Sequence, residues 1–159
     1  MSRRVAFSVL VLCAVACPEW AHAVTNCSVS ADPVAFGSYD PLGLSPTESV
    51  GNVQVSCTLL GVTSLLVSYT ILLSTGSGSS FMPRKMASGR EGLEYNLYTN
   101  ANRTTVWGDE SAGTAIVRES YLLGLATVTR NYAIYGRLFA RQNVPAGVYS
   151  DVITVTVNY

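Results

Sequence analysis

The clearest alternation of apolar and polar residues lies at the end of the chain, in residues 147–159. On a strand with a two-residue period, one face would carry Ile153, Val155, Val157 and Tyr159, and the other Val152, Thr154, Thr156 and Asn158. This pattern predicts a half-buried β-strand. Because the printed sequence ends there, we expect an apolar strand edge with no neighbour from its own chain, which soluble proteins usually avoid.

The same period recurs at short intervals upstream. Residues 27–31 and 34–39 alternate on either side of Asp32 and Pro33, which predicts a first strand broken in the middle. Further strands are predicted at residues 50–58, 65–73, 93–98, 114–117, 121–128 and 132–140. In the most apolar of them, residues 65–73, the inward face would carry Val67, Tyr69, Ile71 and Leu73. Helix signals are almost absent, so we expect an all-β fold, an antiparallel sandwich of about seven strands.

The first residues have the features of a secretory signal. Arg3 and Arg4 precede an apolar run, residues 5–16, that is too short to span a bilayer, and Ala21 and Ala23 form a small-x-small cleavage site. We therefore expect a signal peptide at residues 1–23 and one mature domain at residues 24–159, exported through the periplasm. A lipoprotein cut before Cys17 is the less favoured alternative, because Pro18 follows the cysteine.

Removal of the signal leaves two cysteines, Cys27 and Cys57, and no histidine. An exported compartment permits their oxidation, and a bridge closing a loop of about 30 residues would contribute roughly 3 to 4 kcal/mol in the chain-entropy model. Two thiols without histidine cannot complete a structural tetrahedral metal site unless carboxylates are added. We predict a disulfide, no metal and no cofactor.

Composition and motifs give little support to other functions. The chain is 13% charged with a formal net charge of zero, which does not favour nucleic acid as a partner. The Gly/Ser stretch at residues 74–80 lacks the strand-to-helix context of a phosphate loop. Glu94 and Glu110 have no fixed separation that would suit sugar hydrolysis, and surface carboxylates are far commoner. Residues 81–86 mix apolar and basic side chains, and a short packed strand is favoured over a partner surface. We expect neither an enzyme nor a small-molecule substrate.

Several short blocks, in this order, resemble the spore coat protein U domain family across essentially the whole mature chain. The residues that carry the resemblance are Phe36, Gly37, Tyr39, Tyr95, Asn96, Tyr98, Trp107, Gly108, Tyr135, Gly136, Pro145, Gly147, Tyr149 and Asp151. The family is similar to subunits of archaic chaperone-usher pili of Gram-negative bacteria. The resemblance implies an immunoglobulin-like sandwich that lacks its last strand and a disulfide between its first two strands. It also implies a groove beside Ile153, Val155, Val157 and Tyr159, filled by a periplasmic chaperone and then by a neighbouring subunit's strand.

The same resemblance implies three kinds of partner, namely the chaperone, an outer-membrane usher and neighbouring pilin subunits. Cleavage after Ala23 would leave residues 24–26 ahead of Cys27, too few to donate a strand, so we expect a tip subunit that accepts one. Cleavage after Ala16 would give a longer arm. Leu59 and Leu60 are candidates for an exposed adhesive loop, and burial in the core is the alternative. A structural protein of a spore coat or extracellular matrix is the alternative function.

Overall fold

The computed structural model describes residues 24–61 and 63–159, so the predicted signal peptide and its cleavage sites lie outside the described residues. The strands are β1 Val24–Asp32, β2 Thr47–Leu60, β3 Leu65–Leu73, β4 Arg84–Ser88, β5 Glu91–Tyr98, β6 Val117–Leu123, β7 Val128–Leu138 and β8 Val155–Asn158. Within this described part, the helical content is one 3₁₀ turn, η1 Ser111–Gly113, and no helix has the length and hydrophobicity of a membrane span.

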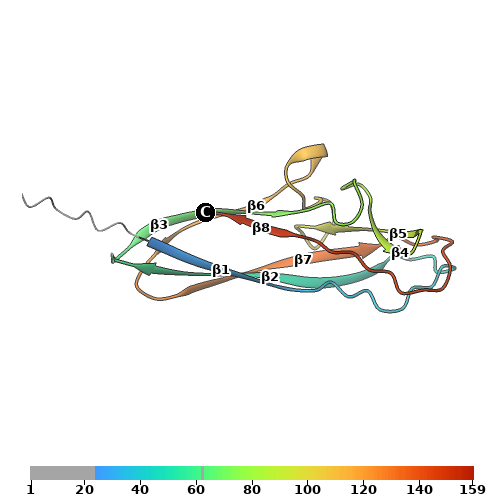
Figure 1. Cartoon of the computed structure of the whole chain (residues 1–159), viewed down its shortest axis with the longest axis horizontal. Coiled ribbons are helices and arrows are strands. Elements are labelled where there is room, and N and C mark those ends of the chain that lie inside the picture. The colour runs from blue at the N-terminus through green and yellow to red at the C-terminus, as the bar shows by residue number, and fades with distance from the viewer. Residues whose placement is uncertain (1–23, 62) are drawn as a thin grey trace, which may run out of the picture.

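The strands form two antiparallel sheets that pack face to face (Figure 1). One sheet has five strands in the order β1-β2-β7-β5-β4, and the other has three in the order β6-β3-β8. β8 pairs on one side with β3 and lies at the edge of its sheet. The architecture confirms the predicted all-β antiparallel sandwich, with eight strands in place of about seven.

Alternating apolar residues of both sheets build the core. β2 contributes Val53, Val55 and Cys57, and β3 contributes Val67, Tyr69, Ile71 and Leu73, all of them buried. The predicted boundaries and inward face of residues 65–73 are therefore confirmed. Trp107 fills the centre and donates its indole N–H to the Ile71 carbonyl at 3.0 Å, so its one polar atom is satisfied.

Several predicted strands are wrong in extent. Residues 114–116 form no strand, and the segment predicted at residues 121–128 contains the end of β6, the connection at residues 124–127 and the start of β7. Residues 34–39 form no ladder, and of the alternating residues near the end of the chain only Val155–Asn158 pair as a strand. Residues 34–39 and 147–154 have strand-like sequences, but a ladder needs a partner backbone. Among the described residues, they find one only at the Ser150–Ala87 bridge and at the bond between Thr154 and Ser74. β2 also runs two residues beyond the predicted end at residue 58, through Leu60.

Candidate binding groove

The chain leaves the five-stranded sheet after β1, because Pro33 has no N–H to donate to the ladder. Residues 33–41, the first wall, then run over the inner face of the sheet. Val34 and Phe36 lie above Gly136 of β7, where a Cβ atom would come within 2.5 Å of Val34 and 2.8 Å of Phe36. Gly51 of β2 makes the same kind of room for Val34. The two glycines thus allow the first wall to lie close to the sheet.

Residues 144–155, the second wall, lead into β8 on the other side of the sandwich edge. Ser150 and Ala87 of β4 exchange two backbone hydrogen bonds of 2.8 and 3.1 Å. Further along, the Thr154 carbonyl accepts a 3.0 Å bond from the Ser74 N–H, and the Thr154 N–H donates to Ser74 Oγ at 2.9 Å. The second wall therefore spans from the edge of one sheet to the edge of the other.

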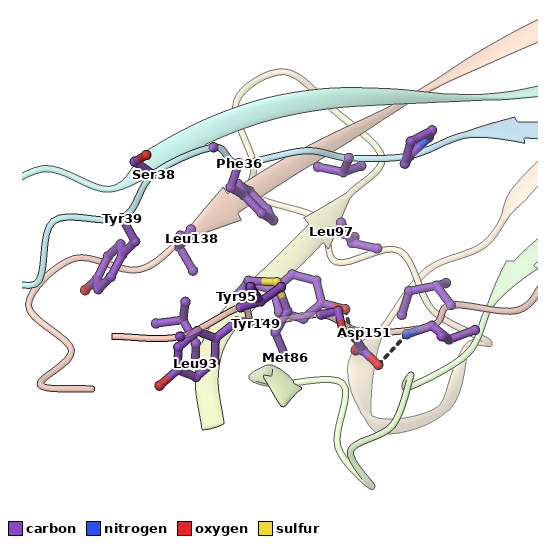
Figure 2. A pocket seen from close by; sticks show the side chains of 18 of the residues that line it. Phe36, Ser38, Tyr39, Met86, Leu93, Tyr95, Leu97, Leu138, Tyr149 and Asp151 are labelled. Atoms are coloured by element: carbon purple, nitrogen blue, oxygen red, sulfur yellow. Dashed lines mark hydrogen bonds between the residues drawn. The ribbon is translucent and has the colours of Figure 1, made fainter. Parts of the chain in front are cut away.

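A cavity of about 960 Å³ separates the two walls. Its lining is mostly apolar and aromatic, and includes Phe36, Tyr39, Met86, Leu93, Tyr95, Leu97, Leu138, Val144, Tyr149, Ile153 and Val155. In Figure 2, Phe36 and Tyr39 of the first wall lie across this space from Tyr149 and Asp151 of the second. A hollow of this kind at the edge of a sandwich fits extended, apolar side chains better than a polar solute.

The main chain of β8 has an open edge, which begins beside the cavity at Val155. Because the Thr154 carbonyl points to Ser74 beside β3, and backbone groups alternate in direction along a strand, the N–H and C=O groups of Val155 and Val157 point away from β3. The side chains of Ile153, Val155 and Val157 are half-buried against the core, whereas Tyr159 is 64% exposed. Ile153 and Val155 line the cavity, so the edge offers both unpaired backbone groups and inward apolar side chains.

One polar pair lies in the lining. Tyr95 Oη donates to Asp151 Oδ2 at 2.6 Å, and Asp151 Oδ1 accepts the N–H groups of Ser77 at 2.6 Å and Val152 at 2.8 Å. Partial burial would raise the pKa of Asp151, but these hydrogen bonds outweigh burial and hold the pKa below its ordinary value. Burial, and then the bond to Asp151, raise the pKa of Tyr95, so the phenol stays protonated and donates.

The structure brings part of the family motif to this cavity. Its lining includes Phe36, Gly37, Tyr39, Tyr95, Pro145, Gly147, Tyr149 and Asp151. Tyr39 Oη accepts the Gln142 N–H at 2.7 Å, and Tyr149 Oη donates to the Pro145 carbonyl at 2.9 Å, so two aromatic rings are fixed from their polar ends.

The other motif residues support the surrounding structure. They are Asn96, Tyr98, Trp107, Gly108, Tyr135 and Gly136. Asn96 is buried and donates to the Phe81 carbonyl at 2.9 Å. Tyr98 is buried beside Tyr135, whose ring lies 5.8 Å from the Arg103 guanidinium. At Gly108 a Cβ atom would collide with Thr114.

Sequence reasoning missed several residues of the lining and its support. The inward position of Met86, Leu93 and Leu97 could have been predicted from the two-residue period of β4 and β5. The burial of Arg84 could not be predicted from the sequence. Its side chain is fully buried because it donates to carbonyls of Ser74 and Trp107, which lie in loops distant along the chain. The favoured interpretation of residues 81–86 as a packed strand is supported in part, because Phe81 is buried and β4 begins at Arg84, whereas Met82 precedes the strand and is 48% exposed.

The other candidate residues are placed as follows. Cys27 and Cys57 face each other across β1 and β2 and form the predicted disulfide. Glu94 pairs with Lys85 at 3.1 Å, and Glu110 pairs with Arg118 at 2.6 Å, both at the surface.

The two leucines of the proposed adhesive loop differ. Leu59 is 5% exposed and belongs to the core, whereas Leu60 is 59% exposed. The expectation of an exposed loop is therefore wrong for Leu59, because it shares the inward phase of Cys57 on β2.

A two-sheet antiparallel sandwich with an open edge strand and an apolar groove beside it defines an incomplete immunoglobulin-like domain. The family model of the Spore Coat Protein U domain matches residues 11–156, and the chain belongs to this family. It is 31% identical to Protein U of Myxococcus xanthus over an alignment of 132 residues, and the match covers 78% of this chain and 70% of that protein.

Among solved structures, the fold resembles a chain in the CsuC–CsuE chaperone–tip adhesion subunit pre-assembly complex from archaic chaperone-usher Csu pili of Acinetobacter baumannii. The TM-score is 0.54 at 23% sequence identity, and the match covers 86% of this chain and 40% of that one. The likeness at this identity concerns the fold.

Proposed function

We propose that the groove accepts an extended β-strand from another polypeptide, and that the protein is a structural subunit of a chaperone-usher pilus. The observation that carries the proposal is the open edge of β8 beside the apolar cavity. A donor strand would pair with the free N–H and C=O groups of Val155 and Val157 and place alternate side chains in the cavity. Residues 34–39, which have no ladder, would form its other neighbour.

Burial of apolar side chains supplies the energy for this step. If the donor buries about five large apolar side chains at roughly 2 kcal/mol each, the gross gain is on the order of 10 kcal/mol before ordering costs. The proposed sequence of partners is a periplasmic chaperone, an outer-membrane usher and then a neighbouring pilin subunit. The Csu pre-assembly complex, which joins a chaperone to a tip adhesion subunit, supports the first of these steps.

The position in the fibre is proposed to be the tip. β1 pairs with β2 from its first residue, Val24 opposite Leu60, so the mature chain left by cleavage after Ala23 would hold no free arm ahead of β1. Such a subunit would accept a strand without donating one. N-terminal sequencing of the exported protein tests this step, because a mature start at Cys17 or earlier would provide an arm.

The end of the sandwich where β2 ends and β3 begins, away from β4 and β5, is proposed as the adhesive surface (Figure 1). Leu66 of β3 and Leu122 of β6 form an exposed cross-strand pair there, and Leu60 and Leu125 are exposed close by in sequence to the same strand ends. Surface-exposed leucines grouped in this way mark an interaction surface more often than isolated ones do.

A fused strand tests the groove. A short Asn-Gly turn followed by an 11-residue strand of alternating Val and Thr is added after Tyr159, so that the strand can return along the open edge of β8. We expect a monomer whose free energy of unfolding rises by at least about 3 kcal/mol, because buried valines replace an open edge. The control has the same residues with all valines grouped together. Equal stability of the two fusions, or an unextended chain that is equally stable and monomeric, would refute the groove.

The family name itself favours a second candidate, a coat or matrix component with the same strand exchange. Co-expression with and without a chaperone encoded beside this protein separates the two. A pilus subunit should reach the surface in linear fibres only with the chaperone and usher, whereas a coat protein should be incorporated without an usher.

A further inference from the structure

The two walls of the groove are held very differently. Apart from a local turn in which Asp40 accepts the N–H groups of Leu42 and Gly43, two hydrogen bonds hold the first wall to the rest of the described chain. They run from Ser49 Oγ to the Ala35 carbonyl at 2.7 Å and from the Gln142 N–H to Tyr39 Oη at 2.7 Å. The second wall is tied to β4 through Ser150 and to the turn after β3 through Asp151 and Thr154. The second wall is thus in place before any donor strand arrives.

The turn at residues 74–77 receives two of these ties. Asp151 Oδ1 accepts the Ser77 N–H at 2.6 Å, and Ser74 holds both the N–H and the C=O of Thr154. Gly76 lies between them with a φ of +80°, and a Cβ atom there would collide with the Asp151 carboxylate. Close approach of the carboxylate to this turn therefore requires glycine, for both space and backbone conformation.

Arg84 holds this turn through the Ser74 carbonyl. Its guanidinium is fully buried and donates from Nε at 3.1 Å and Nη2 at 2.9 Å to the Ser74 carbonyl. Nη2 also donates to the Trp107 carbonyl at 2.7 Å, and Nη1 to Asn96 Oδ1 at 2.9 Å. Ser74 in turn bonds Thr154, the residue before β8. The buried guanidinium of Arg84 therefore fixes the position at which the chain enters β8.

We propose that Asp151 is a positioning residue of the groove, which holds the second wall through Ser77 and Tyr95 so that the edge of β8 is preorganised for a donor strand. This inference rests on the proposed function. Without the carboxylate, the Ser77 and Val152 N–H groups and the Tyr95 hydroxyl lose their acceptor, and ordering of the wall has to accompany binding. Donor affinity should then fall. Because Asp151 itself lines the cavity, amide exchange in the second wall is needed to separate loss of wall order from loss of a direct contact with the donor.

Two readouts test the role of Asp151. The first is hydrogen exchange of the Ser150 and Thr154 amides, whose acceptors are Ala87 and Ser74 and not Asp151 itself. In D151A both should exchange at least about 10-fold faster, while amides of β2 and β7 keep their rates, because local opening is separate from global unfolding. In D151N the amide oxygen can still accept from Ser77 and Val152 while its NH₂ donates to Tyr95 Oη, so the rates should stay within about 3-fold of the parent.

The second readout is affinity for a labelled 12-residue peptide of alternating Val and Thr with a terminal Lys pair. We expect D151A to raise Kd about 10-fold, Y95F to raise it about 3-fold, and D151N to stay near the parent, as expected for loss of three, one and no hydrogen bonds. The matched control is Y69F. Tyr69 is 2% exposed and Tyr95 3%, and Tyr69 Oη bonds Tyr132 Oη at 2.7 Å, a pair that neither lines the cavity nor bonds the second wall. Y69F should cost similar stability and leave Kd unchanged.

Each outcome has one meaning. Unchanged exchange at Ser150 and Thr154 in D151A overturns the positioning role. An equal rise of Kd in Y95F and Y69F would also overturn it, because general destabilisation would then explain the effect. A parent chain that binds no peptide, while D151A still speeds exchange at the wall, refutes the proposed groove and leaves the positioning role supported.

Discussion

Substitution of Gly136 by alanine tests how closely the first wall lies on the sheet. An alanine Cβ would lie 2.5 Å from Val34 Cγ1 and 2.8 Å from Phe36 Cζ, both far inside van der Waals contact. Gly136 is not among the glycines with positive φ, so alanine meets no backbone strain and the effect isolates the steric contact. The side chains of Val34 and Phe36 must move toward the cavity.

The expected magnitude follows from two opposing effects. Overpacking of a close-packed interior costs about 1–3 kcal/mol. Alanine regains about 0.5–1 kcal/mol over glycine in a strand through the lower entropy of the unfolded chain. We therefore expect G136A to lower the free energy of unfolding by about 0–2.5 kcal/mol, whereas a glycine with room for the methyl group should gain stability on the same change.

The control is G92A on β5, where the nearest atom to a Cβ is Lys85 Cδ at 3.4 Å, an ordinary contact. G92A should not destabilise. Urea unfolding followed by far-UV circular dichroism measures all variants, and V34A completes a double-mutant cycle with G136A. V34A removes the clashing methyl, so the two changes should couple by about 1 kcal/mol in the favourable direction. Equal midpoints for G136A and G92A, or simple additivity with V34A, would refute the close approach of the first wall.

Substitution by serine should have different effects at Leu59 and Leu60. L59S should lower the free energy of unfolding by about 2–5 kcal/mol, because it leaves a core cavity and a buried hydroxyl. L60S should change the free energy of unfolding by less than about 0.5 kcal/mol and reduce attachment to a surface. Equal urea midpoints for these two variants would contradict the burial of Leu59. Joint replacement of Cys27 and Cys57 by alanine should lower the free energy of unfolding in urea by about 3–4 kcal/mol, because the disulfide closes a loop of 30 residues. A decrease below about 1 kcal/mol would contradict the chain-entropy model. The pKa of Asp151 is lowered from 3.8, so its contribution to stability is present above pH 3.8 and is lost as the pH falls through the lower folded pKa. Thermal melts at pH 5 and below pH 3.8 should accordingly show a larger loss for the parent than for D151N, and parallel losses would contradict the contribution of Asp151.

The sequence predicted the elements whose partners are supplied by the chain itself. Residues 65–73 alternate, pair on both sides and are buried as expected, because inward position follows directly from the two-residue period. Cys27 and Cys57 were left as a pair by removal of the signal, and they lie directly opposite each other on β1 and β2. The phase of Cys57, continued by two residues, would also have placed Leu59 in the core.

The sequence did not predict features that depend on distant loops. Arg84 reads as a surface cation, yet its acceptors are carbonyls of Ser74 and Trp107 and the side chain of Asn96, residues that only the fold brings together. The ties of Asp151 to Ser77 and Tyr95 are equally non-local. Such networks satisfy buried polar groups and leave no periodic signal along the chain.

The two segments that were wrongly extended as strands are themselves informative. Residues 34–39 and 147–154 alternate as strands do, yet most of their backbone has no ladder partner, and they face each other across one apolar cavity. Unused strand-forming sequence on both sides of an unfilled hollow is what a sandwich would show if one strand between them were supplied from outside. Under the proposed function, one cause accounts for both the failed strand predictions and the position of the cavity, because an inserted strand would give both segments a ladder partner.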